Sequence, residues 1–152
     1  MSNRLFANLL LLSGSVACLS ARADLSADQL KLLQDTGGWQ YITMSEPSGG
    51  VQTTHTCFDG RPHPDVCSGT LTLTASKTFV QNVSIEGKSV QRHGTYDLDG
   101  DQLAFFDEYG TKDGPYTIEL SDETKSLTLT MPQVVVVLEL EKEYRRGTKP
   151  IK

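Results

Sequence analysis

Beyond its first 23 residues, the sequence has no apolar run that approaches the ~20 residues a transmembrane helix needs. It also lacks a basic stripe, and its 14 lysines and arginines are outnumbered by 19 aspartates and glutamates. Such an acidic surface repels phosphate backbones, so we expect no nucleic-acid partner and no attraction to an anionic membrane surface. The length suits a single domain with one core.

Catalytic motifs are equally scarce. The sequence contains no Gly-x-Ser-x-Gly elbow, no phosphate-binding loop and no metalloprotease helix. His55, His63 and His93 fall on polar strands or a loop, without an obvious nucleophile beside them. The three aspartates between positions 97 and 101 do not fit the spacing of a calcium-binding loop, so we interpret them as a solvated hairpin turn. We therefore predict a protein that is not an enzyme and that uses no metal or other cofactor.

The first 23 residues have the pattern of a signal peptide. Arg4 supplies a positive start, residues 5–12 are mostly apolar, and Ala-Arg-Ala at 21–23 is a small-x-small cleavage site. Residues 1–23 are therefore predicted to be removed on export, and the protein is expected to be periplasmic or secreted.

Cys18 supports a different interpretation of the same segment. The preceding Ser15, Val16 and Ala17 partly match a bacterial lipoprotein box, in which the cysteine is lipidated. In that case the protein is a membrane-anchored lipoprotein. Without lipidation of Cys18, no membrane partner is expected.

The hydrophobic period is helical only near the start of the remaining chain. Ser26, with Gln29 three residues later, resembles a capping box and predicts a short helix over residues 26–35. This helix is expected to end before the glycine pair at 37–38.

From Trp39 onward the hydrophobic period is two. On the first strand, Trp39, Tyr41 and Thr43 are predicted to share one face. Asp-Gly at 99–100 is a strong signal for a tight turn, and residues 109–114 are turn-rich. Eight or nine short strands joined by turns favour a closed meander or a sandwich.

Three segments resemble the lipocalin-like (calycin) family. Gly37-x-Trp39 after a short helix is similar to the lipocalin opening motif. Tyr144-x-Arg146 is similar to the closing segment, whose arginine packs on that tryptophan. His93-Gly94-Thr95-Tyr96, followed by a turn and Leu103, resembles a mid-barrel hairpin of short bacterial members.

The resemblance implies an all-β fold, an eight-stranded antiparallel up-and-down barrel (lipocalin-like) with a short N-terminal helix. The domain would occupy residues 24–147, with a disordered tail at 148–152. Trp39 and either Arg146 or Arg145 would then be structural residues, because a guanidinium at the closing end can stack on the indole face. A related open or sandwich arrangement is the alternative.

Two cysteines bracket a short loop. In an exported chain whose third cysteine is lost or lipidated, Cys57 and Cys67 are expected to form a disulfide. Adding His55 and His63 gives an alternative, a tetrahedral zinc set, although an oxidising compartment favours the disulfide.

The inward side chains of such a barrel form either a filled core or a cavity wall, since eight strands leave room for one small ligand at most. The predicted ligand-binding residues are large side chains of one parity: Tyr41, Leu73, Phe79, Tyr96, Phe105, Tyr116 and Ile118. We predict a non-enzymatic protein that binds a small apolar or amphipathic molecule, with tyrosine hydroxyls fixing its orientation.

The alternative function is inhibition of a hydrolase, a protease or lysozyme, by protein–protein contact. The chain is similar in outline to small bacterial periplasmic inhibitors of metalloproteases, which combine a compact barrel, one disulfide and an early Gly-x-Trp. In this interpretation residues 24–27 are an inhibitory arm, and Pro62-His63-Pro64 is a rigid probe. The partner would then be a protein instead of a small hydrophobic molecule.

Overall fold

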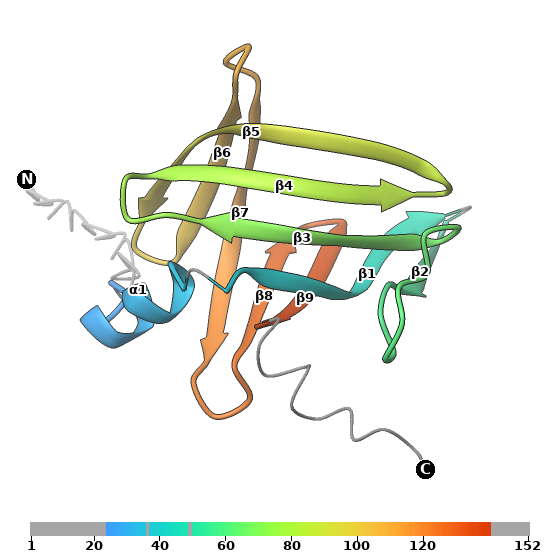
Figure 1. Ribbon diagram of the computed structural model, residues 1–152, viewed down its shortest axis with the longest axis horizontal. Helices are drawn as coiled ribbons and strands as arrows, with labels where there is room; N and C mark the ends of the chain where they lie inside the picture. The colour runs from blue at the N-terminus through green and yellow to red at the C-terminus, as the bar shows by residue number, and fades with distance from the viewer. Residues whose placement is uncertain (1–23, 36, 49, 141–152) are drawn as a thin grey trace, which may run out of the picture.

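The computed structural model describes residues 24–35, 37–48 and 50–140, which form one helix and nine strands (Figure 1). Helix α1 spans Ala27–Leu33. The strands are β1 (Trp39–Ser48), β2 (Val51–Thr56), β3 (Cys67–Leu73), β4 (Thr78–Ile85), β5 (Lys88–Asp99), β6 (Gln102–Asp107), β7 (Lys112–Ser121), β8 (Ser126–Met131) and β9 (Val134–Leu140).

Eight of these strands close into a barrel. The ring runs in the order β1, β3, β4, β5, β6, β7, β8 and β9, and β9 returns to β1. At the closing seam Trp39 pairs with Leu140 in an antiparallel register. Closure pairs the backbone N–H and C=O groups that the two edge strands of an open sheet would leave exposed. The predicted eight-stranded antiparallel barrel with a short N-terminal helix is therefore confirmed, and the open or sandwich alternative is wrong.

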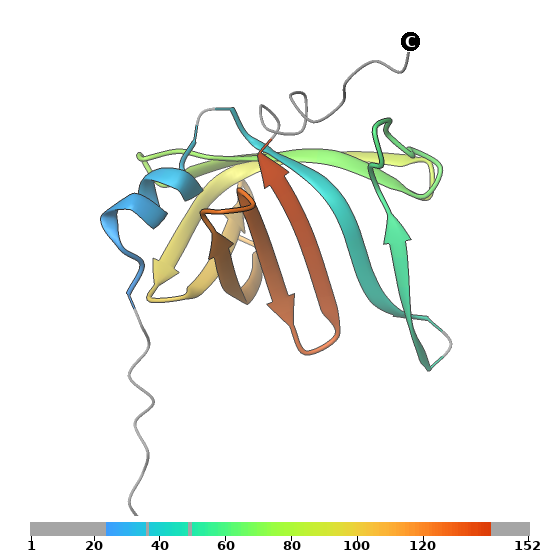
Figure 2. The same cartoon turned by 90° about the horizontal axis from the view of Figure 1, so that it is seen from below.

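The ninth strand, β2, lies outside the ring. It forms a hairpin with the second half of β1, from the pair Thr43–Thr56 to the pair Ser48–Val51. Within the described part of the chain, β2 pairs with no other strand. In Figure 2 this hairpin lies on the far side of the barrel from α1. It extends one wall of the barrel beyond the ring.

The two ends of the barrel differ in what covers them. Antiparallel pairing brings the start of β1 and the end of β9 to the same end of the barrel, and α1 lies at that end (Figures 1 and 2). We call it the helix end. The opposite end, where the start of β9 and the hairpin of β1 and β2 lie, is called the open end.

Helix α1 begins at the predicted capping box and covers the helix end. Ser26 Oγ accepts a hydrogen bond from the Gln29 backbone N–H at 3.2 Å, and Gln29 Oε1 accepts one from the Ser26 N–H at 2.9 Å. The Trp39 indole Nε1 donates to the backbone oxygen of Leu33 at 2.9 Å. Because Leu33 and Trp39 are both fully buried, this bond fixes α1 on the barrel.

The hydrophobic core is densest beside α1. Apart from the two cysteines, the large side chains with less than 2% exposure come from α1 and from inward positions near the helix end. They are Leu33, Trp39, Leu71, Leu73, Phe79, Leu103, Leu127, Leu138 and Leu140. This half of the barrel is a filled core.

The first strand departs from the predicted alternation. The register with β9 shifts between Tyr41 and Thr43, so Met44 pairs with Val136 and joins the core. A β-bulge inserts one residue and turns the following side chains to the other face. The prediction that Thr43 shares the face of Trp39 and Tyr41 was therefore wrong, and Met44 takes the inward position.

Candidate functional site: a cavity at the open end of the barrel

A cavity of about 300 Å³ lies inside the barrel toward the open end. Seven of the eight ring strands contribute to its lining. The lining residues are Tyr41, Met44, Gln81, Val83, Ile85, Val90, Arg92, Phe105, Asp113, Tyr116, Leu129, Val134 and Val136. A larger depression of about 520 Å³ lies against β3, β4 and β5 beside Phe58 and Pro62, and it is more open to solvent. We take the cavity inside the barrel as the candidate site, because polar side chains converge there.

The part of the cavity nearest its mouth is apolar. Val83 and Ile85 lie at the end of β4, Val90 at the start of β5, and Val134 at the start of β9. Met44 on β1, which is paired with Val136 on β9, adds a flexible thioether. This apolar ring favours the apolar part of a bound molecule.

Polar side chains lie one layer deeper, between the apolar mouth and the filled core. Gln81 lies two residues before Val83 on β4, and Arg92 lies two residues after Val90 on β5. Gln81 and Arg92 are paired across these strands, so they share the inward face. With Tyr41, Asp113 and Tyr116 they form a layer that we call the polar floor; its members are Tyr41, Gln81, Arg92, Asp113 and Tyr116.

A continuous chain of hydrogen bonds joins the polar floor. Gln81 Nε2 donates to the Tyr41 hydroxyl oxygen at 2.6 Å. Arg92 Nη1 donates to Gln81 Oε1 at 3.3 Å and to Asp113 Oδ2 at 2.7 Å. The Tyr116 hydroxyl donates to Asp113 Oδ1 at 2.8 Å. The network holds each side chain in one orientation, which pre-organises the site.

A backbone irregularity brings Asp113 and Tyr116 into the same layer. They are three residues apart, so on a regular strand they would face opposite sides. The register between β6 and β7 shifts here, with Tyr116 opposite Leu103 and Asp113 opposite Phe105. Gly114 allows the shift because its φ is +108° and a Cβ there would lie 2.9 Å from the Leu103 carbonyl oxygen.

Both tyrosines of the polar floor stay protonated at neutral pH. Burial raises the pKa of Tyr41 to about 12, although the hydrogen bond from Gln81 opposes the shift. Burial also raises the pKa of Tyr116, and its hydrogen bond to Asp113 adds to the shift. The two phenols therefore act as hydrogen-bond donors and acceptors, not as anions.

The structure divides the seven predicted ligand-binding residues into two groups. Tyr41, Phe105 and Tyr116 line the cavity. The other four lie outside its lining, toward the filled core: Leu73, Phe79, Tyr96 and Ile118. Ligand binding by any of the seven stays a prediction, and only the first three belong to the candidate site.

Tyr96 has a role at the helix end instead. Its hydroxyl donates to the backbone oxygen of Thr74 at 2.7 Å and accepts a bond from Gln34 Nε2 at 2.8 Å. These bonds link β5 to the loop after β3 and to the end of α1. The Tyr96 hydroxyl thus acts as both a donor and an acceptor at the helix end of the barrel.

Sequence reasoning missed three members of the polar floor, Gln81, Arg92 and Asp113. A signal for Gln81 was present, because it lies two residues after Phe79, which was predicted to point inward. A period of two then places Gln81 inward as well. The turn interpretation of residues 109–114 was also wrong in part, because β7 already begins at Lys112.

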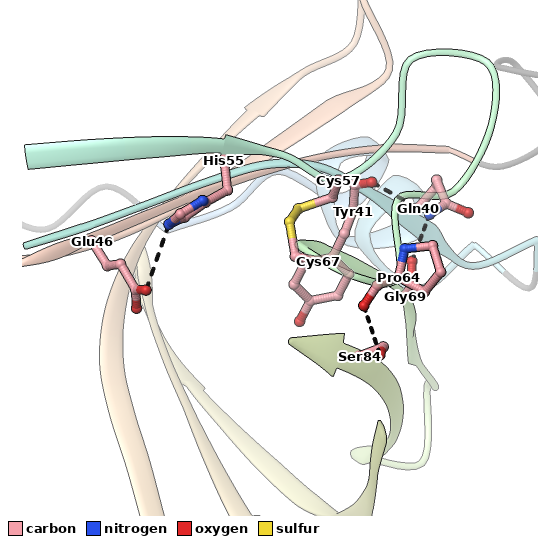
Figure 3. The surroundings of a disulfide bond; sticks show 9 residues. All are labelled: Gln40, Tyr41, Glu46, His55, Cys57, Pro64, Cys67, Gly69 and Ser84. Atoms are coloured by element: carbon pink, nitrogen blue, oxygen red, sulfur yellow. Dashed lines mark hydrogen bonds and ion pairs between the residues drawn. A yellow bond between two sulfur atoms is a disulfide. The ribbon is translucent and has the colours of Figure 1, made fainter. Parts of the chain in front are cut away.

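The predicted disulfide is confirmed. Cys57 and Cys67 are bonded to each other, and both are buried (Figure 3). The alternative zinc set is contradicted, because the two thiols are consumed in the bond. His55 instead faces Glu46 (Figure 3), with Nε2 and Oε1 3.8 Å apart, and His63 Nε2 lies 2.9 Å from Asp59 Oδ1. Among the described residues, no group of three or more His, Cys, Asp or Glu side chains could hold a metal ion.

Several predictions fall on other parts of the chain. The burial of Trp39 is confirmed, but Arg145 and Arg146, its predicted partners, lie outside the described residues. The signal peptide at 1–23, Cys18 and the tail at 148–152 lie outside them too. Within the described ranges, no helix is long and apolar enough to cross a membrane.

No protein-family model matches this chain, and no curated protein is significantly similar to it. The fold and the cavity are therefore the observations from which a function can be argued. A closed eight-stranded antiparallel barrel is consistent with a lipocalin-like fold and compatible with a binding protein. The function must therefore be argued from the cavity, because fold alone does not imply function.

Proposed function

We propose that the protein is a non-enzymatic, lipocalin-like (calycin) binding protein that holds a small amphipathic molecule in the barrel. The observation that carries the proposal is a cavity of about 300 Å³ with an apolar mouth and a hydrogen-bonded polar floor. Small-molecule sites combine mostly apolar walls with a few convergent polar groups in this way. The apolar wall supplies affinity, and the polar floor orients the ligand.

The size of the cavity restricts the ligand. Small-molecule pockets span roughly 300–1,000 Å³, so a cavity of about 300 Å³ lies at the lower limit. A single ring or a short chain fits this volume better than a large lipid. Phe105 and Tyr116, whose ring centroids are 6.0 Å apart, offer aromatic surface to such a molecule.

Titration with 1-naphthylamine, a small uncharged fluorescent probe, tests the proposal. We expect saturable fluorescence enhancement that unlabelled small aromatic molecules reverse. Val83→Phe fills the cavity from β4 and should weaken binding at least about tenfold, because overpacked side chains occupy the ligand's space. The matched control is Val80→Phe on the same strand, at an outward position that is 40% exposed.

Binding of the probe to the two variants shows whether the cavity is the site. Loss of binding in Val83→Phe with normal binding in Val80→Phe supports the cavity as the site. Equal binding in both variants would place the probe elsewhere on the surface and contradict the proposal. Circular dichroism and the melting temperature of each variant check that the barrel still folds.

We also propose that the protein is exported, to the periplasm or the medium, with residues 1–23 as its signal peptide. The disulfide between Cys57 and Cys67 supports an oxidising compartment. Mass spectrometry of the protein from the cell envelope and medium tests this. A measured mass that matches a chain starting at Asp24 supports cleavage after Ala23. A mass that includes a lipid-modified Cys18 would support the membrane anchor instead.

The second candidate function is hydrolase inhibition, and one observation favours it. The loop between Cys57 and Cys67 is exposed, yet its shape is held by the disulfide, by the bridge between Phe58 and Pro62 and by the 2.9 Å contact between His63 Nε2 and Asp59 Oδ1. A rigid exposed loop is suited to insertion into an enzyme cleft. Residual activity of lysozyme, a zinc metalloprotease and a serine protease in the presence of excess protein tests this function. Inhibition that Pro62→Gly abolishes would support it.

A further inference from the structure

The polar floor of the cavity offers donors to a ligand, because its strongest acceptors are already in use. Both carboxylate oxygens of Asp113 accept hydrogen bonds, one from Tyr116 and one from Arg92. Gln81 Oε1 accepts a further bond from Arg92. A ligand that brought only donors would share these oxygens with the protein donors.

Tyr41 carries one donor of the polar floor that has no acceptor within the described part of the chain, beside the remaining N–H groups of Arg92. Its hydroxyl oxygen accepts the bond from Gln81, while none of the described residues accepts its proton. The Tyr41 side chain lines the cavity and is only 4% exposed. A buried donor without a partner is unfavourable, so a ligand acceptor placed here gains a hydrogen bond that water supplies poorly.

The charges of the polar floor cancel. Arg92 and Asp113 are the charged members of the cavity lining, and their side chains meet at 2.7 Å. Each is about a quarter exposed, at 26% and 27%, so the pair is shielded from bulk water. A ligand carboxylate would have to remain without a counter-charge or displace Asp113 from Arg92. Both outcomes are unfavourable in a partly buried site.

We infer that the ligand of this cavity is an uncharged molecule with an apolar body and a carbonyl-type hydrogen-bond acceptor, which Tyr41 binds. The inference rests on the proposed binding function and names the ligand class for the same site. Selection against anions comes from Asp113, which neutralises Arg92. Selection for an acceptor comes from the Tyr41 hydroxyl.

Three probes of nearly the same shape test the ligand class on the unaltered protein. Acetophenone has the carbonyl, isopropylbenzene has no polar atom, and benzoate has the negative charge. Dissociation constants are measured at neutral pH by isothermal titration calorimetry and by NMR chemical-shift changes. We expect acetophenone to bind about tenfold tighter than isopropylbenzene and more than tenfold tighter than benzoate, the size that one hydrogen bond provides.

Two variants then assign the selectivity to residues. Tyr41→Phe should lower acetophenone affinity to that of isopropylbenzene and leave isopropylbenzene binding unchanged. Asp113→Asn should leave Arg92 without its counter-charge and make benzoate bind about tenfold tighter. The matched controls are Tyr109→Phe, at a side chain that is 85% exposed, and Asp122→Asn, whose carboxylate is 82% exposed.

Failure of the inference and failure of the binding function give different results. If acetophenone and isopropylbenzene bind in the cavity but benzoate binds as tightly as either, the ligand class is wrong and the binding function stands. If isopropylbenzene and acetophenone bind the unaltered protein with equal affinity, the proposed role of Tyr41 is overturned. If none of the three probes binds, the binding function itself fails. The comparison on the unaltered protein decides these points even where a variant does not fold.

Discussion

The two halves of the barrel are built from the same strands but packed differently. In the half beside α1, inward positions carry Trp39, Phe79 and Leu127, which are at most 1% exposed. In the open half, the same strands carry Tyr41, Gln81 and Leu129, which line a cavity of about 300 Å³. One half is a filled core, and the other leaves space beneath an apolar mouth.

This difference assigns most of the stability to the helix half and the candidate binding site to the open half. Side chains that border a cavity lose dispersion contacts on one side, so the open half contributes less to stability than an equally apolar filled core. The helix half compensates, because its burial is nearly complete and α1 is fixed to it through Trp39. A binding site in the less densely packed half is consistent with the general location of ligand sites in regions of lower local stability.

The largest effect is expected for Trp39→Ala. It removes a fully buried indole and its hydrogen bond to Leu33, so it should lower the free energy of unfolding by about 3–5 kcal/mol. Urea unfolding followed by circular dichroism measures the change. Trp39→Phe keeps most of the ring and should cost clearly less. A loss below about 1 kcal/mol for Trp39→Ala would contradict the closed helix half.

A matched pair on β8 compares the two halves directly. Leu127 is fully buried in the filled core, while Leu129 lines the cavity two residues later. We expect Leu127→Ala to cost about 3–5 kcal/mol and Leu129→Ala about 2–3 kcal/mol, because Leu129 already lacks neighbours on its cavity side. Urea unfolding of both variants gives the difference. Equal costs would mean that the open half is packed as densely as the helix half.

The helix half was predictable from the sequence. Its side chains alternate strictly, as Leu71 and Leu73 do on β3, and burial follows that period. The capping box at Ser26 and Gln29 is likewise a local pattern with one structural solution. Pattern and packing agree there, so the prediction holds.

The polar floor was only partly predictable from the same rules. A period of two from Phe79 places Gln81 inward, but polar side chains are expected to face solvent, so Gln81 and Arg92 were overlooked. The shifts near Thr43 and at Gly114 reverse the parity of the residues that follow, and both depend on pairing with a distant strand. The residues around each shift do not by themselves predict which distant strand they pair with.

Removal of the disulfide should weaken the open half selectively. Replacing Cys57 and Cys67 together by Ala releases a constraint between positions 10 residues apart, which should cost roughly 2.5–3 kcal/mol on the chain-entropy model. Hydrogen exchange should show faster opening of β2 and the 57–67 loop, with α1 unaffected. Uniform loss of protection at both ends would argue against two halves of different stability.

The smallest effect concerns pH and Tyr41. Its folded-state pKa of about 12 lies above the ordinary value of 10.0, so the phenol is neutral in both states below pH 10 and stability there is undiminished. Between pH 10 and 12 the unfolded chain ionises first, and stability falls by roughly 1–2 kcal/mol at pH 11 for this group. The raised pKa of Tyr116 adds to the loss in the same direction.

Urea unfolding at pH 9, 10 and 11 measures this loss, with absorbance at 295 nm following phenol ionisation. Tyr41→Phe should make the decline shallower, because the variant has no phenol to ionise at that position. Tyr109→Phe, at an exposed side chain, is the control and should leave the decline unchanged. If Tyr41→Phe keeps the full decline, Tyr41 ionises as easily in the folded barrel as in the unfolded chain. The Tyr41 hydroxyl would then be solvated at the open end, and the polar floor would not be the shielded layer on which the proposed ligand class depends.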